Sequence, residues 1–129
     1  MNTKYVMVAS ALFMAVPGLA ATFMPDKILE LAGSTVTEWN LLFIQIAGAL
    51  YIGFALLNWA AKSVIIGGIY AKPLSLGNFM HFFIGSMALI KTAMSDAQLQ
   101  YVWLLTIPYC VFALLFGIIS FTSPKVKEQ

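Results

Sequence analysis

Four long apolar runs divide the chain, and their length constrains the fold more than any other feature. A helix rises about 1.5 Å per residue, so roughly 20 apolar residues cross the hydrocarbon core of a bilayer. Composition agrees with this interpretation, because 61% of the 129 residues are hydrophobic and only 9% are charged. The sequence therefore predicts a single all-α domain, an integral membrane four-helix bundle. Its expected spans cover residues 4–24, 39–61, 74–92 and 101–121.

The first run has a second interpretation, as a secretory signal peptide. Lys4 would supply its basic start, and either Gly18-Leu19-Ala20 or Leu19-Ala20-Ala21 a cleavage context of small residues. The apolar stretch continues past that context to Met24, which favours an uncleaved spanning helix. Cleavage within residues 1–20 would leave three spans in the same orientation.

The segments between the runs are expected to lie at the membrane surface. Residues 25–33 begin with proline and aspartate and end with glycine, which predicts a short interfacial helix. Thr35, followed three residues later by Glu38, matches a capping box, so the second spanning helix is expected from about Val36. Residues 62–73 contain Gly-Gly and Lys-Pro and are expected to form a loop on the cytoplasmic side.

The placement of the lysines predicts the orientation of the chain. An excess of lysine marks the cytoplasmic side of a membrane protein. Two lysines, Lys27 and Lys91, fall on one side of the predicted bundle. Both termini are therefore expected in the cytoplasm. The lysines on that side are Lys4, Lys62, Lys72, Lys125 and Lys127.

The second run carries small residues on two adjacent sides. Gly48 and Ala55 follow Gln45 at helical spacing, whereas Ala49 and Gly53 form a small-xxx-small pair beside them. Small residues allow the backbones of two membrane helices to approach closely. The run therefore predicts helix packing, within the chain or against a membrane protein partner or a second copy.

His81 is the only histidine, and it lies within the third run. An ionisable side chain in a span is costly, which suggests a function as proton relay, haem ligand, or donor to a quinone or lipid headgroup. Gly77, Asn78 and Gly85 share its helical face, so glycine-lined contacts are expected on both sides of it. The alternative is a neutral His81 that forms a hydrogen bond to a facing amide or carbonyl and only holds helices together.

Two sets of residues are candidate binding sites. Lys62 and Lys72 would hold an anionic lipid headgroup, or would only set the orientation of the chain in the membrane. The second set would line a pocket between the second and third spans and bind a small apolar or lipidic ligand. Its members are Gln45, Asn58, Asn78 and His81.

Several classes of function are disfavoured by what the chain lacks. No acidic residue lies within any predicted span, so a catalytic pair of carboxylates is not expected. Cys110 is the only cysteine, which excludes an internal disulfide and a cysteine-cluster metal site. The net charge of +2 is too small for a nucleic-acid-binding surface. We therefore expect neither cofactor nor metal, and an enzyme is the less favoured class.

Three segments together resemble the uncharacterised small four-span membrane proteins of bacteria. They are the Pro25-Asp26 turn, the span Gln45-Ile-Ala-Gly-Ala-Leu-Tyr-Ile-Gly-Phe-Ala-Leu-Leu-Asn58, and Gly-Gly-Ile-Tyr-Ala-Lys-Pro leading to Leu-Gly-Asn-Phe-Met-His81. The resemblance implies a bacterial inner membrane and carries no assigned activity. The sequence favours an accessory, structural or partner-binding membrane subunit, with binding of a small apolar or lipidic ligand as the alternative.

Overall fold

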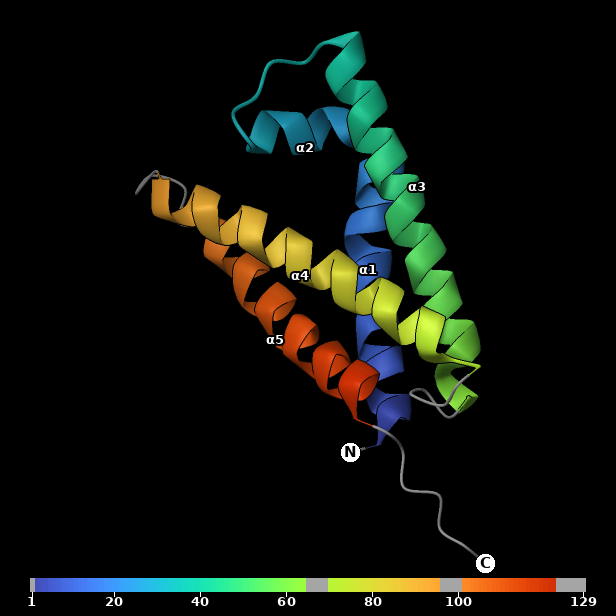
Figure 1. The fold of residues 1–129 in the computed structure, drawn as a ribbon. Coiled ribbons are helices and arrows are strands. Elements are labelled where there is room, and N and C mark those ends of the chain that lie inside the picture. The colour runs from blue at the N-terminus through green and yellow to red at the C-terminus, as the bar shows by residue number, and fades with distance from the viewer. Residues whose placement is uncertain (1, 65–69, 96–100, 123–129) are drawn as a thin grey trace, which may run out of the picture. The chain divides into compact units, whose positions relative to one another are not determined.

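The computed structural model describes residues 2–64, 70–95 and 101–122. Within these residues the fold is all-α, with no strand (Figure 1). The helices belong to two compact units, one from Asn2 to Ser63 and one formed by the described residues after it. We call them the N-terminal and the C-terminal unit. The elements are α1 (Thr3–Phe23), α2 (Pro25–Leu31), α3 (Glu38–Ala60), the 3-10 helix η1 (Ala61–Ser63), α4 (Lys72–Ser95) and α5 (Val102–Phe121).

Four helices are long enough and apolar enough to cross a membrane, which confirms the all-α class and indicates a membrane protein. The observed helix ends differ from the expected ones by at most three residues, as for Ser95 against residue 92, and the end of α5 at Phe121 coincides with the expected one. Parts of the predicted loops, with Gly67-Gly68 among them, lie outside the described residues. The prediction of a single domain stays a prediction. The candidate spans in the described residues are Thr3–Phe23, Glu38–Ser63, Lys72–Ser95 and Val102–Phe121.

In the N-terminal unit α1 and α3 pack antiparallel, at a distance that only small residues permit. A Cβ added at Gly18 would lie 3.0 Å from side-chain atoms of Ile52, and one at Gly48 would lie 2.7 Å from the Thr22 hydroxyl. The helices therefore approach closely at two levels, as the small residues of the second run predict. The short helix α2 contacts both α1 and α3 and buries Leu29 (Figure 1).

The start of α3 corrects one prediction, because the capping box at Thr35 is wrong. The N-cap is Thr37, whose hydroxyl accepts a hydrogen bond from the backbone N–H of Asn40 at 3.2 Å. The Asn40 side chain in turn donates to the carbonyl of Thr35 at 2.7 Å and holds the incoming chain against the first turn. Both threonines suit an N-cap, and with Thr37 in that role Glu38 is the first residue of the helix, where it complements the helix dipole.

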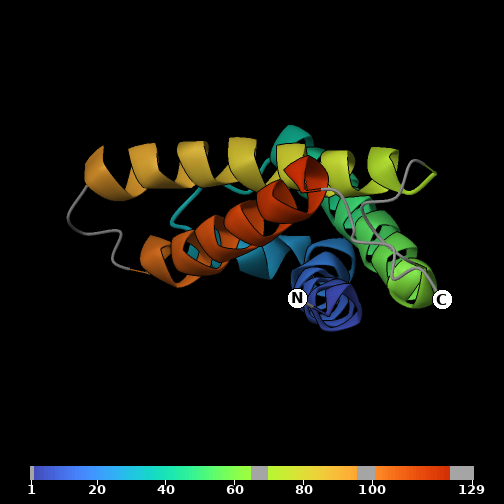
Figure 2. The same ribbon diagram turned by 60° about the horizontal axis from the view of Figure 1, so that its bottom comes forward.

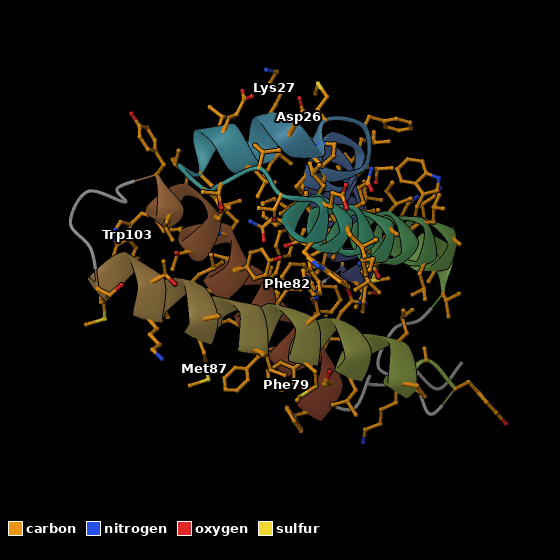
Figure 3. All side chains as sticks on the ribbon, turned by 90° about the horizontal axis from the view of Figure 1, so that it is seen from above. Asp26, Lys27, Phe79, Phe82, Met87 and Trp103 are labelled. Atoms are coloured by element: carbon orange, nitrogen blue, oxygen red, sulfur yellow. The ribbon has the colours of Figure 1, made fainter. Side chains whose placement is uncertain are left out.

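In the C-terminal unit α4 and α5 lie side by side and run antiparallel (Figures 1 and 2). Their shared core is aromatic. Phe82 is fully buried, and its ring lies 4.9 Å from that of Phe112 and 5.8 Å from that of Phe116, centroid to centroid. Met87 projects from the opposite side of α4 and is exposed (Figure 3). Within this unit α4 thus has one side packed against α5 and one exposed side.

Candidate functional site

Asn58 connects the two long helices of the N-terminal unit. It is fully buried, and its Nδ2 donates to the Ser10 hydroxyl of α1 at 3.0 Å. Ser10 donates to the carbonyl of Met7 at 3.0 Å, so a chain of two hydrogen bonds joins α3 to the backbone of α1. Such bonds between membrane helices contribute about 0.6 kcal/mol on average. In this unit Asn58 therefore holds helices together, through a partner that the sequence did not single out.

Gln45 has a different environment on the same helix. It lies 13 residues before Asn58, about 20 Å along the axis, and it is exposed. Among the residues that the structure describes, its side chain has no hydrogen-bond partner. Ala49 and Gly53 continue the same stripe and are also exposed, and a Cβ added at Gly53 would meet nothing within 4 Å.

We call this side the outward face of α3. It is apolar apart from the one carboxamide, with small residues at Ala49 and Gly53, and it lies away from the contact with α1 at Gly48 and Ala55. The two small-residue sides that the sequence predicts are thus unequal, because one is used within the unit and the other is not. The members of the outward face are Leu42, Gln45, Ile46, Ala49, Leu50, Gly53 and Leu57.

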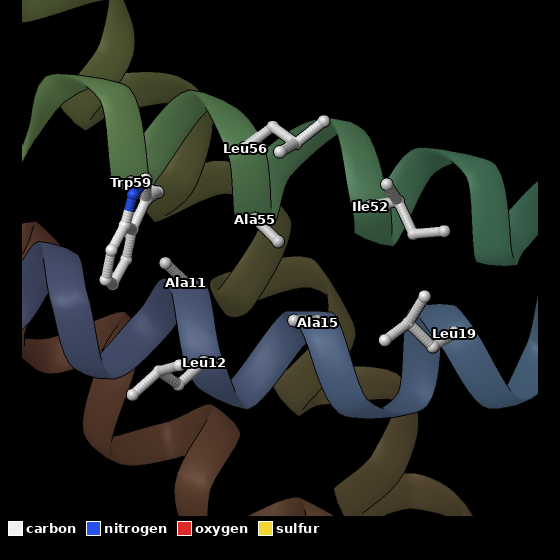
Figure 4. A pocket seen from close by; sticks show the side chains of 8 residues that line it. All are labelled: Ala11, Leu12, Ala15, Leu19, Ile52, Ala55, Leu56 and Trp59. Atoms are coloured by element: carbon white, nitrogen blue, oxygen red, sulfur yellow. The ribbon is translucent and has the colours of Figure 1, made fainter.

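A groove of about 390 Å³ lies between α1 and α3 (Figure 4). Three alanines, Ala11, Ala15 and Ala55, leave its middle open because their side chains are short. Larger apolar side chains surround them, with Trp59 near one end and Leu19 and Ile52 near the other (Figure 4). Leu12 and Leu56 complete the lining, which contains no charged or amide side chain.

The Trp59 end of the groove carries a positive charge. The Nζ atom of Lys62 lies 3.7 Å from the centroid of the Trp59 ring, a cation–π contact. Because α1 and α3 are antiparallel, Lys4 at the start of α1 belongs to the same end of the unit as η1. Lys72 is the first residue of α4 and is exposed. The prediction that Lys62 and Lys72 hold one headgroup stays a prediction.

The opposite end of the N-terminal unit is acidic. Asp26 and Glu30 lie on α2, and Glu38 begins α3. Lys27, the basic residue of this end, forms an exposed ion pair with Glu30 at 3.0 Å. The hydrogen bond to Glu30 raises the pKa of Lys27 above its ordinary value, so its charge is retained and balanced locally. Within the described part of the chain, the lysines of this unit that form no ion pair, Lys4 and Lys62, therefore lie at the groove end.

In the C-terminal unit His81 meets Tyr109 of α5. The His81 Nε2 and the Tyr109 hydroxyl oxygen are 3.3 Å apart, and the tautomer decides which of them donates. Gly85, one turn further along α4, makes room for this tyrosine, since a Cβ there would lie 2.5 Å from its ring. At Gly77, by contrast, nothing in the described part of the chain lies within 4 Å of such a Cβ. The expected glycine-lined contact is thus present at Gly85.

Tyr109 is the partner of His81 that sequence reasoning missed. The sequence does contain a signal for it, because a tyrosine inside an apolar span needs a hydrogen-bond partner for its hydroxyl.

Asn78, one turn before His81, is fully buried and donates to the carbonyl of Leu74 in its own helix at 3.0 Å. In the described residues no group of three or more His, Cys, Asp and Glu side chains is placed to hold a metal ion.

The four residues of the predicted pocket fall in two units. Gln45 and Asn58 lie on α3 of the N-terminal unit, and Asn78 and His81 lie one turn apart on α4 of the C-terminal unit. A pocket between the second and third spans therefore stays a prediction. The groove that the structure does contain lies between the first and second spans, at Ala11 and Ala55.

No protein family, curated protein or solved structure matches the chain. The resemblance to small four-span bacterial membrane proteins stays a prediction, and the function is inferred from the geometry of the chain itself.

Proposed function

We propose that the protein is a structural or accessory subunit of the bacterial inner membrane that assembles with a second copy of itself through the outward face of α3. Both termini lie in the cytoplasm in this proposal. The observation that carries it is the exposed Gln45 carboxamide on an otherwise apolar face of a spanning helix. Trp39 and Trp59, 20 residues apart, anchor that helix at the two membrane surfaces.

The depth of Gln45 explains why it needs a partner. It lies six residues inside Trp39, about 9 Å along the helix, within the hydrocarbon region that the two tryptophans delimit. An unsatisfied polar group there costs several kcal/mol. Facing lipid, the Gln45 amide would have no water to bond, so another helix with a polar group at the same depth stabilises it.

A second copy of α3 supplies that group by symmetry. A carboxamide both donates and accepts, so two Gln45 side chains related by a two-fold axis satisfy each other. Ala49 and Gly53, one and two turns further along the stripe, are small enough for the backbones to approach closely. The face is therefore self-complementary in hydrogen bonding and in shape.

Crosslinking in native membranes tests the proposal. Cys110 is replaced by serine, a cysteine is placed at Ala49, and two copies with different tags are co-expressed. We expect Ala49→Cys to crosslink the two tags and Gly53→Leu to abolish that product. The control Val16→Cys, an exposed position on α1, is expected to give no product.

No product from Ala49→Cys would show that a second copy does not cover this face, because each chain then carries one cysteine and a product requires two chains. The same conclusion follows if the product forms equally well with Gly53→Leu.

Binding of a small apolar or lipidic ligand is the second candidate function. It is supported by the groove between α1 and α3, an open space with an apolar lining that side chains of the two helices do not fill.

A further inference from the structure

We infer that the groove between α1 and α3 binds one acyl chain of an anionic phospholipid whose headgroup lies against the Lys62 ammonium. The inference deepens the ligand-binding candidate and does not depend on self-assembly. The groove is lined by α1 and by the α3 residues Ile52, Ala55 and Trp59 on the side toward α1, with Leu56 at its border with the outward face.

The shape of the groove fits a narrow apolar chain. Its volume is about 390 Å³, and its middle is lined by Ala11, Ala15 and Ala55 (Figure 4). A helix with its side chains is about 10 Å across, so a partner helix would reach this space only with single side chains. A flexible hydrocarbon chain can follow the alanines along the whole length between Trp59 and Leu19.

The groove is short enough to lie within one leaflet of a bilayer. Trp59 and Ile52, at its two ends on α3, are seven residues apart, about 10 Å along the helix. Half of a hydrocarbon core is about 15 Å thick. Because Trp59 stands at the expected interface, the groove runs from the headgroup level toward the bilayer centre, as an acyl chain does.

The positive charge at the Trp59 end of the groove favours an anionic headgroup. The contact with Trp59 holds the Lys62 Nζ 3.7 Å from a ring that itself lines the groove. Lys4 adds a second cation at the same end of the unit. A phosphodiester with a net negative charge is stabilised by these two ammonium groups, whereas a zwitterionic headgroup carries a cation of its own. Lysines at the cytoplasmic ends of spans are typical contacts of anionic lipids.

The fluorescence of Trp59 can report which lipid occupies the groove. With Trp39→Phe and Trp103→Phe as background, Trp59 is the only tryptophan left in the protein, because the chain contains three. The full chain is reconstituted in vesicles that contain phosphatidylglycerol or phosphatidylcholine with brominated acyl chains, diluted into the unbrominated lipid of the other class. Bromine quenches tryptophan fluorescence only at short range, so the quenching measures which lipid occupies the groove.

We expect brominated phosphatidylglycerol to quench Trp59 more strongly than brominated phosphatidylcholine at equal mole fraction. Lys62→Gln removes one cation and should lower this preference about fivefold, while Lys62→Arg should keep it. Ala15→Leu fills the groove and should reduce quenching by both lipids. The matched control Lys91→Gln, an exposed lysine of α4, should leave the preference unchanged.

Equal quenching by the two lipids, or no change with Lys62→Gln, would overturn the anionic assignment. Quenching that is unaffected by Ala15→Leu would overturn the groove as the site, and so would a crosslink between two copies through Ala15→Cys. Protease resistance of the α1–α3 pair in each variant shows that the unit is folded, whether or not two copies assemble. Loss of the lipid preference in a folded variant therefore bears on this inference alone, and loss of the Ala49→Cys crosslink bears on self-assembly alone.

Discussion

At the scale of single residues, Gly85 is a position of the C-terminal unit that a larger residue would disturb. A Cβ there would lie 2.5 Å from Cε1 and 2.8 Å from Cδ1 of Tyr109, so the ring that meets His81 would have to move. We expect Gly85→Ala to destabilise the protein by about 1–3 kcal/mol, the usual cost of overpacking. Unfolding by sodium dodecyl sulfate in mixed micelles would measure the change.

Gly77→Ala is the matched control, because it lies two turns earlier on the same helix with open space where its Cβ would be. It should be neutral, or stabilising by up to about 1 kcal/mol, since alanine is the better helix former. If the two variants unfold alike, the close approach of α4 to Tyr109 is not a feature of the folded protein.

Residue detail was the part of the fold that the sequence predicted least well. The start of α3 was placed one threonine too early, because Thr35 and Thr37 each precede a suitable residue and only backbone geometry separates them. The contact of His81 with Tyr109 depends on the register between α4 and α5, and the hydropathy pattern does not determine that register. A partner 28 residues away in the sequence leaves no periodic signal.

At the scale of the elements, the spans could be predicted and their packed sides could not. Length and hydropathy suffice for a span, because bilayer thickness sets the number of apolar residues. Inside a membrane the lipid-facing and the packed sides of a helix are both apolar, so no polar face marks the exposed side. For α3 this left two small-residue sides, Gly48 with Ala55 and Ala49 with Gly53, that the sequence could not rank.

A pair of substitutions on α3 tests which side packs against α1. Gly48→Leu would push a side chain into Thr22, since its Cβ alone would lie 2.7 Å from the hydroxyl and 2.9 Å from the backbone nitrogen. We expect it to destabilise the N-terminal unit by several kcal/mol. Gly53→Leu should leave that unit intact, because its Cβ has open space.

The two variants are compared by protease resistance of the α1–α3 pair in detergent. Equal resistance would contradict the packing of α3 on α1 through Gly48. Equal sensitivity would show that Gly53 also belongs to the contact with α1. The outward face would then not be available to a second copy.

At the scale of the whole molecule, charge separates the two ends of the N-terminal unit. Its unpaired lysines, Lys4 and Lys62, lie at the end where α1 begins and α3 finishes. Lys27, at the α2 end, is paired with Glu30. The positive-inside rule depends on lysine placement near span ends, so this distribution favours the end with η1 in the cytoplasm.

Cysteine labelling tests this orientation directly in the Cys110→Ser background. A cysteine at Ser63 in η1 should react with a membrane-impermeant maleimide only in inside-out vesicles, and one at Ser34 between α2 and α3 only in intact cells. Both positions are exposed, so lack of reaction reports on membrane side rather than burial. The opposite pattern would reverse the proposed topology and move the groove to the other leaflet.

Substitution of the lysines tests whether they determine this orientation. Lys4→Gln combined with Lys62→Gln removes the charge bias of the N-terminal unit and should make both cysteines react in part from both sides, because two orientations then compete. Lys27→Gln removes a lysine that Glu30 already balances, and it should leave the labelling pattern as it is. Since the same two lysines are proposed to hold the lipid headgroup, the single change Lys62→Gln distinguishes the roles. It should weaken lipid preference while Lys4 still keeps most chains in one orientation.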